Sequence, residues 1–242
     1  MTDFLLEVKQ VSKTVGKRSL LNNISFELEK GKIYGFIGPN GAGKTTMMRI
    51  MTGLMQPTSG SVKIASYDVQ TDREKALSKV GAIIESPVFF DYMTGRQVLR
   101  NLSRLHLGVA SSDREKHIKE LLERVGLENR GDDKVKTYSL GMKQRLGIAQ
   151  SMLGNPELLL LDEPSNGLDP MGMRELRDII LRLRDSDNYA FFVSSHLLDE
   201  LQQMCDELIV IKEGTLIWKG AADQLIKDGQ RLEDAFMGLM GL

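Results

Sequence analysis

A strand, a glycine-rich turn and the start of a helix follow one another in Lys32-Ile33-Tyr34-Gly35-Phe36-Ile37-Gly38-Pro39-Asn40-Gly41-Ala42-Gly43-Lys44-Thr45-Thr46. Glycines let backbone N–H groups turn inward around an anion, and the positive end of the following helix favours negative charge. Lys44 places a point charge on the β- and γ-phosphates of a nucleotide, and the Thr45 hydroxyl suits Mg²⁺ coordination. This pattern predicts a phosphate-binding loop from Gly38 to Thr46.

The rest of the chain alternates predicted strands with predicted helices. Short apolar runs predict buried strands over 80–84, 157–161, 189–194 and 207–211, with a further strand over 215–218. Helices are expected over 44–54 and over 174–183. Met47, Met51 and Met55 recur at four-residue spacing and are interpreted as core residues rather than a binding surface. Such alternation favours a parallel α/β core.

Two segments depart from this alternation. Residues 4–28 alternate apolar and polar side chains in short runs, which predicts a half-exposed antiparallel sheet. Residues 86–155 show apolar side chains at three- and four-residue spacing, which predicts an inserted helical subdomain. We therefore expect a single domain over 1–242, in which 1–85 and 156–242 form the β subdomain and core.

A second acidic element suits a metal beside the phosphates. The apolar run 158–161 ends in the adjacent carboxylates Asp162 and Glu163. At the carboxyl end of a parallel strand such groups point into the ligand crevice. Asp162 is predicted to hold Mg²⁺ through water, and Glu163 to orient and polarise the attacking water.

Composition limits the other classes of function. The chain has 32 Lys and Arg against 33 Asp and Glu, a net charge of −1, so it lacks the basic excess that nucleic acid or anionic lipid attracts. The single cysteine, Cys205, excludes an intrachain disulfide framework. No apolar run approaches the roughly 18 residues needed to span a bilayer.

Three further segments carry a family resemblance. Tyr138-Ser139-Leu140-Gly141-Met142-Lys143-Gln144-Arg145 resembles the signature motif of ABC-type ATPases. The segment 162–170 resembles their Walker B motif and D-loop, and Val193-Ser194-Ser195-His196 resembles their switch histidine. The motifs follow one another in the family's order and cover essentially the whole chain.

The resemblance implies a P-loop NTPase (RecA-like) fold and Mg²⁺-dependent ATP hydrolysis. It implies that Ser139 and Gly141, at the start of a helix, bind the γ-phosphate of ATP held by a second subunit, and we expect that subunit to be a copy of this chain. It implies that His196 hydrogen-bonds the same phosphate and senses its loss. His106 and His117, on helical stretches, are interpreted as structural.

The sequence departs from the family pattern at three places. Leu140 and Met142 stand where glycine and glutamine are usual in the signature, and Val15 stands where an aromatic commonly stacks on adenine. Adenine stacking is therefore either weak or supplied from elsewhere. Glu85 stands where the Q-loop glutamine is usual. It is either a solvated carboxylate or a ligand of Mg²⁺ or water.

Glu85, together with this signature, resembles the ATPases of bacitracin- and lantibiotic-type self-protection exporters. That resemblance implies a peripheral subunit on the cytoplasmic face of the membrane, touching the membrane only through a separate permease. Phe89, Phe90 and Tyr92 lie where the family receives the permease's coupling helix, although packing inside the helical segment is the alternative. The other functions considered are an importer ATPase and a non-transport ATPase regulating cell-envelope or division processes.

Overall fold

A computed structural model describes residues 4–106, 112–225 and 232–240. Its strands are β1 (Leu6–Val15), β2 (Arg18–Leu28), β3 (Ile33–Ile37), β4 (Ser59–Ile64), β5 (Tyr67–Asp68), β6 (Val80–Ile83), β7 (Leu158–Asp162), β8 (Ala190–Ser195), β9 (Glu207–Lys212) and β10 (Thr215–Gly220). Its helices are α1 (Lys44–Met51), α2 (Arg73–Leu77), α3 (Gly95–Ser103), α4 (Arg114–Arg124), α5 (Leu140–Ser151), α6 (Pro170–Asp187), α7 (Leu198–Met204), α8 (Ala222–Leu225) and α9 (Leu232–Met240), with a 3₁₀ turn η1 at Val135–Thr137.

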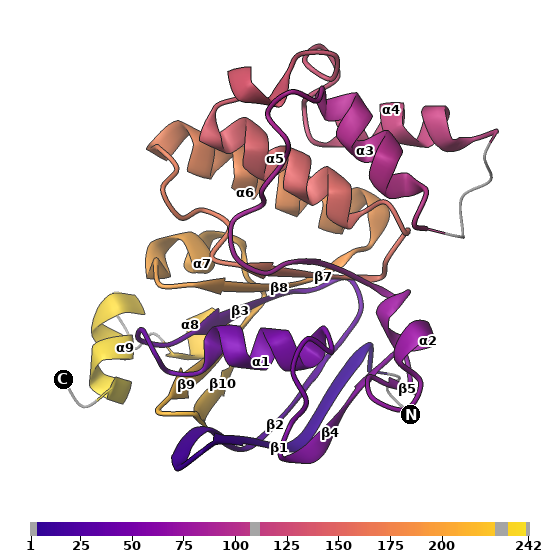
Figure 1. The fold of residues 1–242 in the computed structure, drawn as a ribbon. Helices are drawn as coiled ribbons and strands as arrows, with labels where there is room; N and C mark the ends of the chain where they lie inside the picture. The colour runs from indigo at the N-terminus through magenta and orange to yellow at the C-terminus, as the bar shows by residue number, and fades with distance from the viewer. Residues whose placement is uncertain (1–3, 107–111, 226–231, 241–242) are drawn as a thin grey trace.

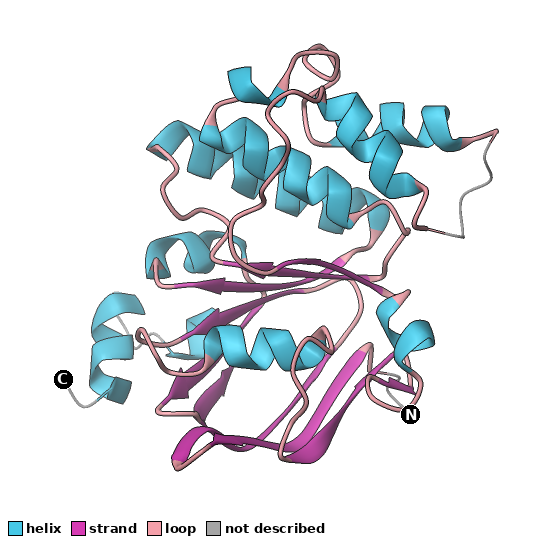
Figure 2. Cartoon of the chain, in the orientation of Figure 1, coloured by secondary structure: helices cyan, strands magenta, loops and turns pink. Residues whose placement is uncertain are grey.

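The strands form two sheets (Figures 1 and 2). The antiparallel sheet has the strand order β2-β1-β4-β5, and the larger sheet has the order β10-β9-β3-β8-β7-β6. In the larger sheet β9, β3, β8, β7 and β6 run parallel, and only β10 is antiparallel to its neighbour. The mixed α/β architecture predicted from the alternation is confirmed.

Both faces of the larger sheet are buried, because alternate strand residues point to opposite sides. On β7, Leu158 and Leu160 pack into a core with α1 and the antiparallel sheet, whereas Leu159 and Leu161 pack into a core with α3, α4, α5 and α6. Accordingly α1 lies between the two sheets, and α5 lies across the opposite face (Figure 1). This separation places the phosphate loop and the signature segment in different layers.

Most predicted elements are present with shifted ends. The helix expected to reach residue 54 ends at Met51, and Met47 and Met51 are fully buried core residues as predicted. The helix predicted over 174–183 is longer, because Asp169 caps it by accepting a hydrogen bond from Gly172 N at 2.8 Å and Pro170 occupies its first turn. The prediction missed β4, β5 and the short helix α2; β4 pairs with β1, and β5 pairs with β4 to complete the antiparallel sheet.

The segment predicted as a helical subdomain contains α3, α4, η1 and α5, between β6 and β7 in the chain. Its apolar side chains, such as Leu99 and Ile118, join the same core as Leu159 and Leu161 of the sheet. The helical segment therefore shares a core with the strands it packs on. The proposed boundaries at 86 and 155 stay a prediction.

Candidate functional site

The phosphate loop joins β3 to α1 and requires glycine for two physical reasons. Gly41 and Gly43 have φ angles of +80° and +110°, in the left-handed region that favours glycine. A Cβ at Gly38 would lie 2.4 Å from the carbonyl oxygen of Ile211, so the loop packs directly on the end of β9. Further contacts, such as Ala42 N donating to Pro39 O at 3.1 Å, fold the loop upon itself. These contacts restrain the backbone of the loop.

Lys44 begins α1 and is buried, with only 6% of its surface exposed. Its Nζ donates to Gly38 O at 2.7 Å and lies 3.8 Å from Glu163 Oε1. Burial lowers the pKa of Lys44, and the charges of Glu163 and Asp162 oppose that shift. The ammonium is thus placed over the loop with its charge only partly compensated, which suits binding of an anion.

Asp162 ends β7 as a buried carboxylate, 7% exposed, with both oxygens hydrogen-bonded. Thr45 Oγ1 donates to Asp162 Oδ2 at 2.8 Å, and Ser194 Oγ donates to Oδ1. Ser194 lies opposite Asp162 in the parallel register of β7 and β8. The arrangement brings together the carboxylate and the hydroxyl predicted to serve one metal.

Glu163 lies next to this pair and links it to the switch histidine. Its backbone N donates to Ser194 Oγ at 2.9 Å, and its φ of +46° is unusual for a residue other than glycine. His196 Nδ1 lies 3.1 Å from Glu163 Oε2, while the other carboxylate oxygen faces Lys44. Glu163 therefore lies between the phosphate-binding lysine and His196, which suits a group that positions water.

A cavity of about 260 Å³ opens over the loop. Its wall is built from the loop, the start of α1, Glu163 and the first residues of β2; the lining residues are Arg18, Leu20, Asn40, Gly41, Gly43, Lys44, Thr45, Thr46 and Glu163. Six of these, Asn40, Gly41, Gly43, Lys44, Thr45 and Thr46, belong to the predicted phosphate loop. The predicted loop thus lines a real concavity, at the carboxyl ends of the parallel strands.

The signature segment lies elsewhere. Ser139 caps α5 by accepting a hydrogen bond from Met142 N at 3.2 Å, and Gly141 follows in the first turn. Both line a second cavity of about 430 Å³, together with D-loop residues that include Leu168 and Asp169, and this cavity shares no lining residue with the cavity over the phosphate loop. Within one chain, the signature segment is not part of the phosphate-loop site.

Glu85 is also separate from the cluster. It follows β6 with a φ of +72°, its side chain is 64% exposed, and it forms an ion pair with Arg49 of α1. It is not among the residues that line the phosphate-loop cavity. The structure thus gives Glu85 a partner that the sequence did not indicate.

The aromatic segment after Glu85 divides into two parts. Phe90 and Tyr92 are exposed, with ring centroids 5.5 Å apart, and Val88 beside them is exposed too. Phe89 instead packs against the core of the helical segment. The core-packing alternative therefore applies to Phe89, and contact of Phe90 and Tyr92 with a permease helix stays a prediction.

The two remaining histidines contact the helical segment. His117 Nε2 lies 3.3 Å from Leu153 O, and the ring of His106 packs close to Gly154. Burial lowers the pKa of His106, with a further contribution from the charge of His117. Their contacts agree with a structural role.

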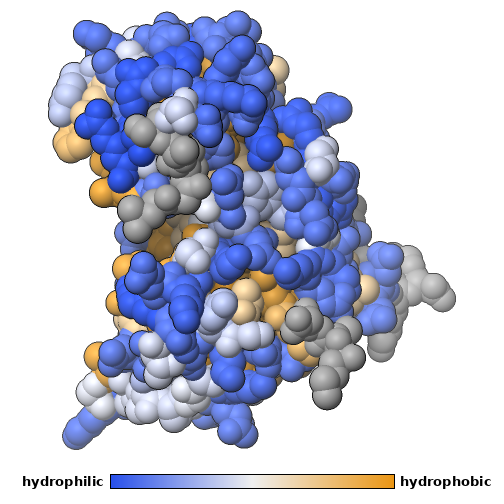
Figure 3. All heavy atoms as spheres, turned by 90° about the vertical axis from the view of Figure 1, so that its right-hand side faces the viewer, coloured by the Kyte–Doolittle hydropathy of each residue, from blue (hydrophilic) through white to orange (hydrophobic). Residues whose placement is uncertain are grey.

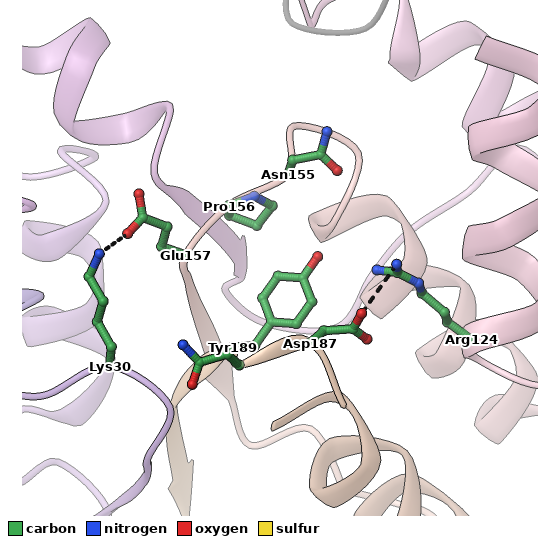
Figure 4. A pocket seen from close by; sticks show the side chains of 8 residues that line it. Lys30, Arg124, Asn155, Pro156, Glu157, Asp187 and Tyr189 are labelled. Atoms are coloured by element: carbon green, nitrogen blue, oxygen red, sulfur yellow. Dashed lines mark hydrogen bonds and ion pairs between the residues drawn. The ribbon is translucent and has the colours of Figure 1, made fainter. Parts of the chain in front are cut away.

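A further cavity, of about 340 Å³, lies at the opposite edge, beside the amino ends of β7 and β8 (Figure 4). Its charges pair with each other: Lys30 Nζ lies 2.6 Å from Glu157 Oε2, and Arg124 Nη2 lies 3.2 Å from Asp187 Oδ1. Because ligands of open α/β sheets bind at the carboxyl ends of the strands, the loop cavity is the candidate active site.

Sequence reasoning missed several residues around the candidate site. Ser194 was read only as part of the switch motif, yet it holds both Asp162 and the backbone of Glu163. Arg18 and Leu20 were covered only by the antiparallel sheet predicted over 4–28, yet both line the cavity. The strand order that makes these residues neighbours has no signal in the sequence.

No helix in the described ranges is long and apolar enough to cross a membrane. The face of the molecule in Figure 3 is mostly hydrophilic, with hydrophobic residues scattered across its middle. Among the described residues, no group of three or more His, Cys, Asp or Glu side chains is placed to hold a metal ion.

Comparison with known proteins agrees with this geometry. The family profile described as ABC transporter matches residues 21–166. The chain is 41% identical over 232 residues to the lantibiotic transport ATP-binding protein SrtF of Streptococcus pyogenes, covering 96% of both chains. It is 41% identical over 229 residues to the bacitracin transport ATP-binding protein BcrA of Enterococcus faecalis, covering 95% of this chain and 73% of that protein.

A solved structure described as the ATP-binding subunit of an ABC transporter superimposes with a TM-score of 0.85 at 28% identity, covering 98% of this chain and 99% of that one. The predicted fold is therefore confirmed, and so are ATP as the nucleotide and ATP hydrolysis as the activity class. Given its phosphate loop, its paired carboxylates and these matches, the chain belongs to the family of ABC transporter ATP-binding subunits.

Proposed function

We propose that this chain powers export of a peptide antibiotic, acting as a pair of ATPase subunits on a separate permease at the cytoplasmic face of the membrane. The observation that carries the ATPase part is the cluster of Lys44, Asp162, Glu163 and His196 around the phosphate loop. The similarity to bacitracin and lantibiotic transport subunits carries the choice of substrate class.

Thr45 and Asp162 would hold Mg²⁺. Their oxygens lie 2.8 Å apart at the loop, and oxygen atoms are the ligands that Mg²⁺ prefers. Since the described residues offer no larger cluster of ligands, phosphate and water oxygens would complete the coordination. The ion, when bound, neutralises charge on the β- and γ-phosphates.

In hydrolysis, Lys44 binds the phosphates and Glu163 orients the attacking water. Because Ser194 fixes the backbone N–H of Glu163, the carboxylate starts from a restricted position. Its Oε2 lies within hydrogen-bond distance of His196, which is then able to hold the γ-phosphate and the carboxylate in one arrangement. Preorganised groups of this kind stabilise the transition state with little reorganisation.

The second half of each ATP site would come from a second copy of the chain. Ser139 and Gly141 lie at the positive end of α5 and line an open cavity, so they suit contact with a phosphate. That cavity contains no lining residue of the phosphate-loop cavity. Head-to-tail pairing would bring the two together and make hydrolysis a property of the interface.

Glu85 would report nucleotide state to the permease. Its carboxylate could contact Mg²⁺ or water only by giving up its ion pair with Arg49. Both partners are substantially exposed, so the pair contributes little stability and exchanges easily. Exposed Val88, Phe90 and Tyr92 follow within a few residues and would receive the permease helix.

The whole proposal is tested in cells that carry the chain with its candidate permease. We expect resistance to bacitracin or a lantibiotic to rise, the Lys44→Ala variant to give none, and a polytopic membrane protein to co-purify with the chain. A chain that captures no membrane protein and instead disturbs cell division would favour the regulatory alternative.

The Glu85 step has its own test. Glu85→Gln keeps size and one acceptor oxygen, so ATP hydrolysis should stay within about tenfold of the parent. Glu85→Ala should reduce antibiotic resistance more than basal hydrolysis, and Arg49→Ala, which frees the carboxylate, should not. Unchanged resistance and hydrolysis in Glu85→Ala would make Glu85 a solvated strand end.

A further inference from the structure

The hairpin of β1 and β2 ends beside the phosphate loop. Val15 and Arg18 are directly opposite each other across a two-residue turn, in which Gly16 has a φ of +59°. A Cβ at Gly43 of the loop would lie 2.9 Å from the carbonyl oxygen of Leu20. The first residues of β2 therefore pack against the backbone that surrounds the phosphates.

Arg18 lines the loop cavity with an uncommitted side chain. It is exposed, and no hydrogen bond or ion pair of its guanidinium occurs among residues 4–106, 112–225 and 232–240. Leu20, two residues on in the same strand, lines the same cavity. Because both side chains line this cavity, Arg18 and Leu20 form one wall.

This wall is the part of the cavity that is available to the nucleoside, because the rest of the cavity serves the phosphates. The amides of the loop and Lys44 take the phosphates, and Thr45 and Glu163 serve the reacting end. Arg18 and Leu20 are the lining residues that have none of these roles and lie outside the loop and α1. One is a planar cation and the other is apolar, the two surfaces that suit an aromatic face.

We propose that Arg18 is the nucleobase-binding residue of this subunit, stacking its guanidinium plane on the base while Leu20 packs beside it. Val15, opposite Arg18, is aliphatic and 54% exposed, so it offers no ring for stacking. The inference rests on the proposed ATP site and adds to it the group that holds the base.

Calorimetry on the full chain should compare the binding of ADP with that of pyrophosphate. The comparison separates the contribution of the base to affinity from that of the phosphates, and it needs no turnover. Arg18→Ala should weaken ADP binding about fivefold, the scale of an exposed cation–π contact, and leave pyrophosphate binding within about twofold. Arg18→Lys keeps the charge but not the plane, so it should also weaken ADP binding.

The double variant Val15→Tyr with Arg18→Ala should recover ADP affinity, because directly opposed residues share a face and the phenol ring can take the place of the guanidinium. Equal loss of ADP and pyrophosphate in Arg18→Ala would make Arg18 a phosphate ligand and overturn the proposal. Unchanged ADP binding in Arg18→Ala would overturn it as well. If the parent chain itself bound neither ADP nor pyrophosphate, as we expect of the Lys44→Ala variant, the ATP site itself would be refuted.

Discussion

The phosphate loop and the signature segment are the two parts of the proposed ATP site, and they differ in how much of their geometry lies within one chain. Around the loop, Lys44 and Asp162 are buried and already contact protein partners. At the signature, Leu140 is exposed, and a Cβ at Gly141 would meet no atom nearer than 3.9 Å. One half is complete in the monomer, and the other half is an open surface.

This difference predicts how substitutions in each half of the site act. Substitutions at the loop should act on a single chain, because the contacts are internal. Substitutions at the signature should leave the single chain intact and act only when two copies meet.

The largest expected effect is that of Lys44→Ala. It removes the buried ammonium over the loop, so ATP hydrolysis should fall below detection and ATP binding should weaken by roughly ten- to a hundredfold, as for other charge-assisted contacts. Calorimetry and phosphate release measure both, with Lys116→Ala on the exposed face of α4 as the control. Near-normal turnover by folded Lys44→Ala would refute the phosphate-site assignment.

Gly141→Asp tests the signature segment. Because the site has room for a side chain, the variant should fold and bind ATP as a monomer. Its carboxylate should repel the partner's γ-phosphate and reduce turnover at least about a hundredfold, with ATP-dependent dimers lost in size exclusion.

Gly141→Ala is the matched control, since it adds the Cβ without the charge, and it should keep the dimer. Adding Ser139→Ala should strengthen the block at a cost of about 1 kcal/mol in stability, because Ser139 caps α5. A Gly141→Asp chain that still dimerises with ATP would argue against a composite site.

Glu163→Gln tests the activation of water at the phosphate-loop half of the site. ATP affinity should persist, hydrolysis should fall by roughly 10²–10⁴-fold because the positioned base is lost, and ATP-bound dimers should accumulate in size exclusion. Glu120→Gln on α4 is the control. Hydrolysis at the parent rate would mean that another group activates water, with Glu85 as the first candidate.

Ser194 is fully buried and does not line the phosphate-loop cavity, so the smallest effect is expected for Ser194→Ala. It removes the donor to Asp162 and the acceptor for the Glu163 backbone, so hydrolysis should fall about tenfold through misplaced carboxylates. Ser151→Ala, which removes another buried hydroxyl that donates to a backbone carbonyl, is the control. An equal loss of stability in both variants, with hydrolysis reduced in neither, would leave Ser194 purely structural.

Several features could be predicted because they depend on residues close together in the sequence. The glycines that turn the loop, the lysine that begins α1 and the apolar run ending in Asp162 form one local pattern each, and the structure contains the corresponding elements. The burial of Met47 and Met51 follows equally from their helical spacing.

The neighbours of these residues depended on tertiary structure. Strand order sets Ser194 opposite Asp162, hairpin packing brings Arg18 to the loop, and the approach of β6 to α1 pairs Glu85 with Arg49. None of these contacts has a sequence signal, because each joins segments whose separation along the chain says nothing about which strand edges and helix faces meet. The local sequence thus specifies the chemistry of the loop and of the paired carboxylates, whereas the packing of two sheets against α1 selects the side chains that surround them.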